Sequence, residues 1–205
     1  MPMQRKTQRE VTRRKTAMPY VTSEMTAIMQ HVERALGDEG VVESIHFSPT
    51  ALTMIRHVMM TGGSIITDTT LALADVDRTL ADKLGVKVDC FIDDPHVVML
   101  AEQKHTTRAE VALDYALSLP GLKLIAVGSA PMALNQLLRR AAVEPMNEVV
   151  VLAAPTGFAS VVQLKERIWD SDLASIVVRG KKGGASVVVA ILNALMTESI
   201  REQNL

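Results

Sequence analysis

Apolar residues near the start of the chain recur at helical spacing. Beginning at Thr22 or the serine after it, either of which can cap a helix, the apolar residues at positions 25, 28, 29, 32 and 36 share one face. Gly37 then ends this predicted helix. A second helix is predicted to begin at Ser48, a cap followed by Pro49 at the first helical position, and to run to residue 61.

Beyond residue 62 the pattern changes to short apolar runs that alternate with helical segments. The predicted strands lie at 64–67, 86–92, 122–127, 148–153 and 175–178, and the predicted helices between them at 76–84, 102–117, 133–140 and 160–169. The valines at 187–189 favour a strand by propensity, but their place directly after a glycine turn favours a buried helix over 185–196. This alternation predicts a three-layer α/β/α, Rossmann-like fold with a mostly parallel five-stranded sheet.

The first 20 residues differ from the rest of the chain. They hold six Lys or Arg residues against one acid, Glu10, and show no apolar periodicity. We interpret residues 1–20 as a basic, mobile N-terminal arm, and residues 21–205 as a single domain. An alternative is an arm that reaches over an anionic ligand, or over nucleic acid.

Composition narrows the classes of function. The chain is 48% hydrophobic and 22% charged, with a net charge of −1, as in ordinary globular proteins. Aromatic residues make up 3%, too few for the stacking platforms of base-binding folds, so nucleic acid is not the expected partner. Cys90 is the single cysteine, which excludes an intrachain disulfide. With no apolar run near the roughly 18 residues that span a bilayer and no signal peptide, we expect a cytoplasmic protein that does not enter the membrane.

Glycine-containing turns follow three successive predicted strands. They are Gly128-Ser129-Ala130-Pro131, Pro155-Thr156-Gly157, and Arg179-Gly180-Lys181-Lys182-Gly183-Gly184. Parallel strands bring such turns to one edge, where each following helix directs unpaired N–H groups and a positive dipole end. The three turns together predict an anion site, and none has the spacing of a nucleotide-binding loop. Arg179 and the two lysines fit a carboxylate ligand.

The five histidines do not form a metal site by their spacing, and no Ser/His/Asp or Cys/His elbow is present. His31 lies on the first predicted helix, next to the core-facing Val32. A lone helical histidine is more often a packing or surface residue, but histidine is also the natural proton donor near neutral pH.

Several stretches match one protein family in the same order over roughly residues 25–196. They are Thr107-Arg108-Ala109, the three glycine turns above, Phe47-Ser48-Pro49, and the segment 62–68 that ends at Asp68. In these motifs the chain resembles the precorrin-8X methylmutase family of cobalamin biosynthesis.

The resemblance implies an isomerase that moves a methyl group from C-11 to C-12 of (cobalt-)precorrin-8. It also implies a homodimer with an α/β sheet and no cofactor or metal. The substrate is a carboxylate-rich tetrapyrrole, and a helix-borne histidine donates a proton to its ring. Carried onto this chain, the proton donor is His31. The substrate-binding residues are Asp68, Arg108, Gly128, Ser129, Ala130, Gly157, Arg179, Gly180, Lys181, Lys182, Gly183 and Gly184.

The histidine motif leaves a second function open. The family pattern R-x-x-H appears here as His31-Val32-Glu33-Arg34, with its two outer residues exchanged. His46, beside Phe47, is another candidate for the proton donor. The alternative to an isomerase is a catalytically diverged paralogue that binds a tetrapyrrole or corrinoid.

Overall fold

The computed structural model describes residues 21–204, so the basic segment 1–20 lies outside the described residues. Within this range one sheet contains six strands in the order β1-β6-β5-β4-β2-β3. Their bounds are Ile45–Phe47 (β1), Ser64–Thr67 (β2), Lys87–Asp89 (β3), Lys123–Val127 (β4), Val149–Ala153 (β5) and Ala174–Val178 (β6). All neighbouring pairs are parallel except β1 with β6.

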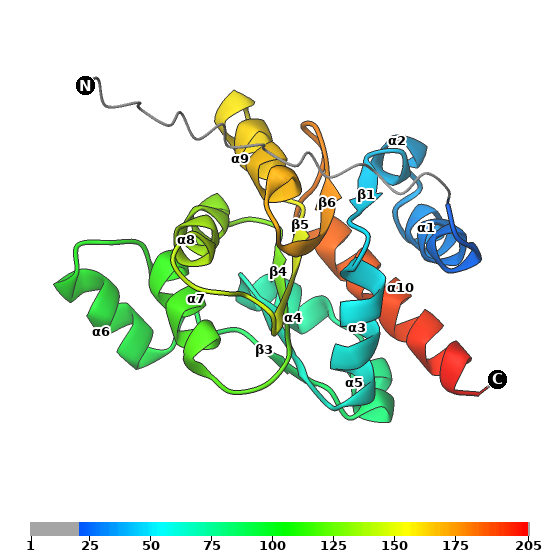
Figure 1. The fold of residues 1–205 in the computed structure, drawn as a ribbon, viewed down its shortest axis with the longest axis horizontal. Coiled ribbons are helices and arrows are strands. Elements are labelled where there is room, and N and C mark those ends of the chain that lie inside the picture. Colours follow the sequence, from blue (N-terminus) through cyan, green and yellow to red (C-terminus); the bar gives the residue numbers. More distant parts are fainter. Residues whose placement is uncertain (1–20, 205) are drawn as a thin grey trace, which may run out of the picture.

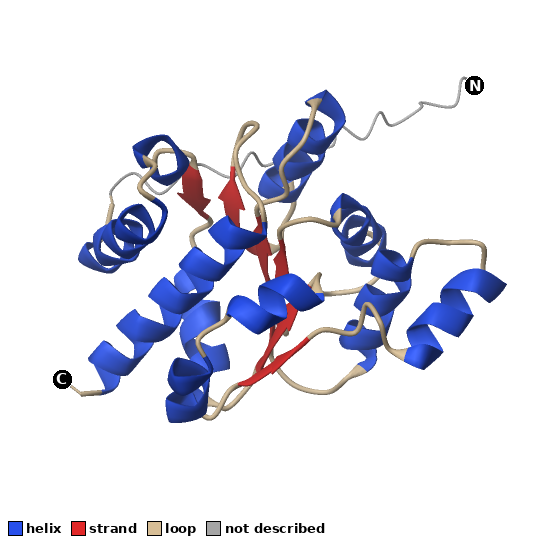
Figure 2. Ribbon diagram, turned by 180° about the vertical axis from the view of Figure 1, so that it is seen from behind, coloured by secondary structure: helices blue, strands red, loops and turns tan. Residues whose placement is uncertain are grey.

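Helices cover both faces of this sheet. Their bounds are Ser23–Leu36 (α1), Glu39–Val42 (α2), Ala51–Met60 (α3), Thr70–Asp75 (α4), Arg78–Leu84 (α5), Pro95–Gln103 (α6), Arg108–Ser118 (α7), Pro131–Ala141 (α8), Ala159–Asp170 (α9) and Ala185–Gln203 (α10). In Figure 1, α6, α7 and α8 lie to the left of the strands, and α1 and α3 to the right. Figure 2 shows from behind that the strands lie between two groups of helices. The predicted α/β/α fold is confirmed.

The strands alternate their side chains between two hydrophobic cores. In β4, Leu124 and Ala126 belong to the core beneath α1, α3 and α10, whereas Ile125 and Val127 belong to the core beneath α7, α8 and α9. A strand whose two faces are both buried needs apolar residues at every position, which explains the continuous apolar runs in the sequence. The valines at 187–189 lie in helix α10 and are buried, as predicted.

The sequence prediction of five strands is one short. The missing strand is β1, which pairs with the outer edge of β6. It has only three residues, too few to show the alternation that marks a strand in a sequence. The same pairing explains why Ser48 does not cap the next helix: its hydroxyl oxygen accepts a hydrogen bond from the Ser175 N–H at 2.8 Å. Helix α3 begins two residues later than predicted, at Ala51, with Thr50 in the cap position.

The predicted helix over 102–117 is wrong at its start. α6 ends at Gln103 and α7 begins at Arg108, and His105 between them adopts a left-handed φ of 51°. Thr107 and Glu110 form a reciprocal capping box that fixes the new helix start. The predicted helix over 76–84 likewise begins later, at Arg78, behind an Asp77 cap.

The strand order creates a switch point between β2 and β4. The chain leaves β2 toward β3 on one side and continues from β4 toward β5 on the other. Ligands of open parallel sheets bind at the carboxyl ends of the strands at such a point. Thr67 pairs with Ala126 there, so the residues that follow β2 and β4 meet at the same place.

Candidate active site

The turn after β4 already holds a carboxylate, and it belongs to Asp68. Asp68 Oδ2 accepts hydrogen bonds from the backbone N–H groups of Gly128 at 3.1 Å, Ser129 at 2.6 Å and Ala130 at 2.6 Å. These N–H groups were predicted to bind an anionic ligand, and they bind an anion of the protein instead. Asp68 therefore holds the turn closed rather than leaving it open to substrate.

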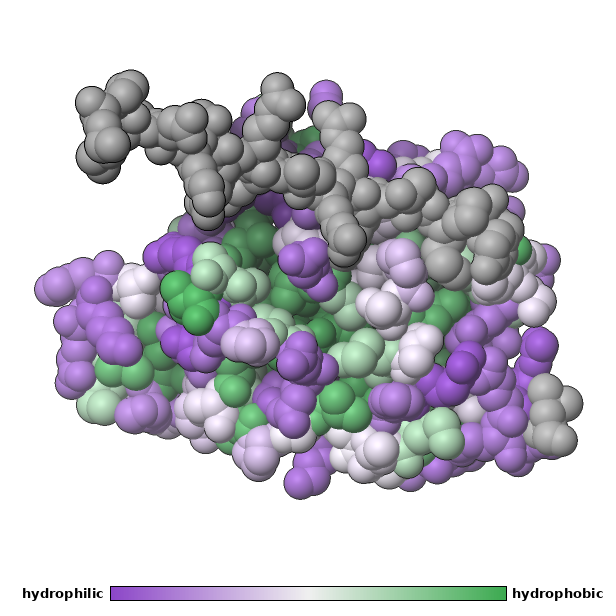
Figure 3. All heavy atoms as spheres, viewed as in Figure 1, coloured by the Kyte–Doolittle hydropathy of each residue, from purple (hydrophilic) through white to green (hydrophobic). Residues whose placement is uncertain are grey.

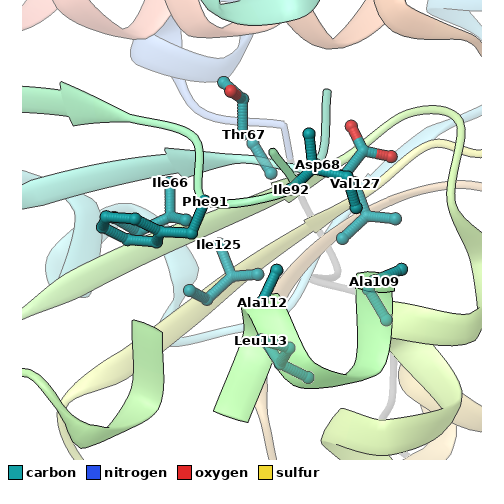
Figure 4. A pocket seen from close by; sticks show the side chains of 12 residues that line it. Ile66, Thr67, Asp68, Phe91, Ile92, Ala109, Ala112, Leu113, Ile125 and Val127 are labelled. Atoms are coloured by element: carbon teal, nitrogen blue, oxygen red, sulfur yellow. The ribbon is translucent and has the colours of Figure 1, made fainter. Parts of the chain in front are cut away.

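A small pocket of about 20 Å³ lies beside Asp68 at the switch point. Figure 4 shows side chains of α7, including Leu113, facing Ile125 and Val127 of β4, with the Phe91 ring at one side. Asp68 Oδ1 is buried here and has no hydrogen-bond partner among residues 21–204. Since ligand pockets usually measure about 300–1,000 Å³, this one, at about 20 Å³, has room for roughly one water molecule and cannot enclose a tetrapyrrole.

Arg179 was predicted to bind a carboxylate of the substrate. In the structure it binds a carboxylate of the protein, that of Glu166. Its guanidinium forms two hydrogen bonds to the Glu166 carboxylate and lies 5.8 Å from the centroid of the Trp169 ring. Hydrogen bonding to Glu166 raises the pKa of Arg179 further, against the effect of burial. Arg179 thus fixes the end of β6 against α9.

The two lysines of the same loop differ in their contacts. Lys182 Nζ lies 2.6 Å from Asp38 Oδ1, and both side chains are nearly half exposed. Lys181 is exposed and forms no ion pair with any residue of the described range 21–204. Lys181 is therefore the cation of this loop that is most available to an anionic ligand.

The glycines at the carboxyl edge are required by close packing of the backbone. A Cβ atom at Gly183 would collide with the carbonyl oxygen of Ala154, and the Gly184 N–H donates to that same oxygen at 2.7 Å. A Cβ atom at Gly128 would lie 2.9 Å from the Gly184 oxygen. At Gly157 a Cβ atom would lie 2.5 Å from Val161 Cγ2. The loops after β4, β5 and β6 are thus locked together, as their predicted convergence requires.

Lys165 lies beneath the loop after β6, and the sequence analysis gave it no role. It is fully buried on α9, and its Nζ donates to the Lys182 carbonyl oxygen at 2.9 Å. Burial lowers the pKa of Lys165 to about 8, although the Glu166 carboxylate opposes the shift. The sequence did carry a signal, because Lys165 lies one turn before Ile168 and Trp169 on the apolar face of its helix.

Arg108 lies at the opposite end of the carboxyl edge from Lys181 and Lys182. It begins α7, is about half exposed, and pairs with Asp93 at 3.3 Å. Four strand spacings of about 4.8 Å separate β3 from β6, so these cations are spread over roughly 19 Å. A small anion cannot contact both ends, whereas a large ligand with several carboxylates can.

Exposed apolar side chains lie among these charged groups. Leu71, Met132 and Phe158 stand at the starts of the helices that follow β2, β4 and β5, and Phe158 is 88% exposed. Figure 3 shows hydrophobic residues at the surface in the middle of the face seen in Figure 1, with hydrophilic residues toward its left and right ends. Exposed apolar side chains at the helix starts, together with the cations of the carboxyl edge, suit a ligand with an apolar body and a charged periphery.

His31 lies on α1, away from the glycine turns. Its Nε2 pairs with Glu198 Oε1 at 3.2 Å, and its side chain is 34% exposed. Glu198 is buried and is 13 residues along α10 from Ala185, or roughly 20 Å at 1.5 Å per residue. The other end of α1 does reach the carboxyl edge, because Asp38, just beyond it, pairs with Lys182. Arg34 stands one turn nearer to that end than His31.

His46, the alternative histidine, is part of the packing at the edge of the sheet. Its ring Nδ1 lies 3.0 Å from the Ser44 carbonyl oxygen, and its ring meets Trp169 edge-on at 5.8 Å. Trp169 therefore contacts both His46 and Arg179. These packing contacts are enough to explain a histidine at position 46. The contact with Glu198 explains a histidine at position 31 only in part.

Two further observations concern metals and membranes. Residues 21–204 contain no cluster of three or more His, Cys, Asp or Glu side chains arranged to hold a metal ion. No helix in the same range has the length and apolar content needed to cross a bilayer.

Comparison with known proteins identifies the family. The sequence model of precorrin-8X methylmutase matches residues 5–198. Cobalt-precorrin-8 methylmutase of Salmonella typhimurium is 33% identical over 83% of this chain and 80% of its own length. Precorrin-8X methylmutase of Pseudomonas aeruginosa is 27% identical over 87% of this chain and 86% of its own length.

Solved structures agree with the sequence comparison. Precorrin-8X methylmutase from Thermus thermophilus superposes with a TM-score of 0.78 at 25% identity, over 90% of this chain and 91% of that one. A precorrin-8X methylmutase related protein has the same fold, with a TM-score of 0.80 at 22% identity over 89% and 95% of the two chains. With the family match covering nearly all of the fold, the chain belongs to the precorrin-8X methylmutase family.

Proposed function

We propose that this protein is a (cobalt-)precorrin-8 methylmutase, an isomerase that moves a methyl group from C-11 to C-12 of a tetrapyrrole in cobalamin biosynthesis. The observation that carries the proposal is the family match over residues 5–198, supported by a relative that is 33% identical. Because the reaction is an isomerisation, substrate and product contain the same atoms, and the proposed mechanism uses no cofactor.

The carboxyl edge supports binding of a large polyanion. Arg108 lies at one end and Lys181 and Lys182 at the other, with the exposed Phe158 and Met132 among them. In the proposed complex the cations contact peripheral carboxylates, and the apolar side chains contact the body of the macrocycle. Fixed contacts around the periphery would hold the ring in a reactive shape and so lower the barrier to migration.

We propose His31 as the proton donor to the ring. Glu198 contacts His31 Nε2, and Nδ1 has no hydrogen-bond partner within residues 21–204. A buried carboxylate on one ring nitrogen can orient the imidazole and leave the other nitrogen to face the ligand. A macrocycle held at the Lys182 end of α1 would need to extend along about two helical turns, roughly 10 Å, to meet His31.

The homodimer implied by the family remains a proposal. Two features support it: the pocket at the switch point is far too small to enclose a tetrapyrrole, and the aromatic side chain of Phe158 is 88% exposed. A second subunit could cover the exposed part of the ligand. Sedimentation equilibrium that finds only monomer across the working concentration range would contradict this assembly.

A binding protein without catalysis is the second candidate. It is favoured by one observation, the exchanged order of His31 and Arg34 relative to the family motif. In this alternative the chain carries a corrinoid or tetrapyrrole, and His31 serves only the contact between α1 and α10.

Variants of His31 separate these two functions. If His31 donates the proton, His31→Ala should lower kcat about 100-fold or more while the protein still binds the product. His57→Ala is the matched control, since His57 is an exposed histidine on α3 and should leave kcat unchanged. Full turnover in His31→Ala would overturn the assignment of the donor. Tight binding with no turnover in the unaltered protein would favour the carrier.

A further inference from the structure

Lys165 is among the largest fully buried side chains of residues 21–204, with 0% exposure. Lysine is almost never fully buried unless it is paired, because its ammonium loses strong hydration. Among residues 21–204 a single hydrogen bond, to the Lys182 carbonyl oxygen, serves a group with three N–H donors. A methionine would fill nearly the same volume without burying a charge. Packing alone therefore does not account for a lysine at this position.

The carbonyl group that Lys165 holds belongs to the loop carrying the two exposed lysines. The main chain of Lys182 is fixed from below by Lys165, and its side chain is directed outward by Asp38. The Gly184 N–H ties the far end of the loop to Ala154. Lys181 has no ion pair of its own within the described residues. Its position therefore depends on the loop, and Lys165 supports the middle of that loop through the Lys182 carbonyl group.

The charged groups around Lys165 compensate its charge only in part, through Glu166. On its own helix, Glu166 is paired with Arg179, and Asp170 also lies near that guanidinium. From the segment after α1, Asp38 is paired with Lys182. Each of these carboxylates already has a cation as its neighbour, so the ammonium of Lys165 adds to the positive potential of the loop above it.

We propose that Lys165 is a positioning residue whose buried positive charge holds the loop Arg179–Gly184 and strengthens its binding of tetrapyrrole carboxylates. The proposal rests on the proposed function, because it takes the ligand to be the same macrocycle. Lys165 acts through Lys181 and Lys182 and does not contact the ligand itself.

The charge should make ligand binding depend on pH. Because burial lowers the pKa of Lys165 to about 8, the ammonium is present at pH 7 and is lost as pH rises through about 8. The Kd for the corrin product, titrated into the protein and followed by absorbance, should therefore rise between pH 7 and pH 9. A Kd that stays constant over this range in the unaltered protein would overturn the proposal, and this measurement needs no variant.

Two variants test the cause of the pH dependence. Lys165→Met should bind the corrin product about tenfold more weakly at pH 7, as expected for the loss of one charged interaction, and its Kd should not change between pH 7 and pH 9. Its thermal midpoint at pH 7 should equal or exceed that of the unaltered protein, because a buried charge is removed. Lys83→Met, at an exposed lysine on α5, is the control and should change neither value.

Lys165→Arg keeps a charge that does not titrate below pH 12. It should restore part of the affinity at pH 7 and retain it at pH 9. Product affinity in Lys165→Met equal to that of the unaltered protein at both pH values would overturn the proposal. Because product binding is measured without turnover, failure of catalysis would contradict the proposed function and leave this test intact.

Discussion

Asp68 and Lys165 are two charged side chains that the fold turns inward beneath the carboxyl edge. Asp68 binds the N–H groups after β4, and Lys165 binds a carbonyl group after β6. The Asp68 carboxylate neutralises the positive end of the turn after β4. The Lys165 ammonium, by contrast, places a positive charge beneath the loop after β6. Their opposite signs make the turn after β4 and the loop after β6 unequal, so substrate carboxylates are expected near β6 and not at the turn after β4.

Removing the Asp68 carboxylate should destabilise the protein. In Asp68→Ala the three backbone N–H groups lose a charged acceptor, so the free energy of unfolding should fall by about 2–3 kcal/mol. Urea denaturation measures this change. Asp82→Ala, at an exposed acid on α5, should change stability by less than about 0.5 kcal/mol. Equal stabilities of the two variants would contradict the role given to Asp68.

Glu110 should make stability depend on pH in acid. Burial alone would raise its pKa, but hydrogen bonds from Thr106 and Thr107 together with the charge of Arg139 lower the pKa to about 2. A depressed folded-state pKa stabilises the protein above the ordinary value of 4.5, and this stabilisation is lost as pH falls from about 4.5 to 2. The full effect is about 3 kcal/mol.

The Glu110 effect can be measured by denaturation at a series of pH values. Glu110→Gln should be less stable at pH 7, and its stability should fall less steeply between pH 4.5 and 2. Glu102→Gln, at an exposed residue of α6, should follow the unaltered protein. A Glu110→Gln variant with the same acid profile as the unaltered protein would refute this account.

At the scale of elements, two glycines of the loop after β6 differ in how closely the loop after β5 packs against them. Gly183 has a φ of +147° and no room for a Cβ atom beside Ala154, whereas Gly180 has a φ of +74° and open space around it. Gly183→Ala should therefore displace the loop, weaken product binding and lower stability by about 3 kcal/mol or more. Gly180→Ala should cost only about 1–2 kcal/mol for its left-handed backbone.

The two glycine variants are best compared by product titration and urea denaturation together. The same alanine is added three residues apart, so a difference between them reports on the space around the Cβ atom. Equal losses of affinity would mean that the contact between Gly183 and Ala154 does not position the loop.

The elements with strong periodicity were predictable from sequence, and the weak ones were not. The apolar runs of β2, β4, β5 and β6 predicted strands because both of their faces are buried. β1 was missed because three residues at the sheet edge carry almost no pattern, and its pairing with β6 is set by residues 129 to 133 positions away in the sequence. The boundary between α6 and α7 depends on the Thr107–Glu110 capping box, a pattern that is present in the sequence and is typical of a helix start.

For the whole molecule, the sequence predicted which loops meet at the carboxyl edge better than which of their groups are free. The glycine turns were expected to meet at the carboxyl edge, and Gly128 does pack against Gly184 there. The sequence did not show that Asp68, Glu166 and Asp38 occupy the predicted donors and cations, because each comes from another segment of the chain. Of the cations predicted to bind carboxylates, Lys181 and the exposed Arg108 remain the most accessible.

The central claim is that this edge holds a tetrapyrrole and isomerises it. The most direct test is to incubate purified protein with precorrin-8, or its cobalt form, and to record the visible spectrum and the mass of the pigment. The account predicts a shift to the spectrum of the corrin product at unchanged mass, because a methyl group moves and no atom is lost. An unchanged spectrum in the presence of bound pigment would contradict it.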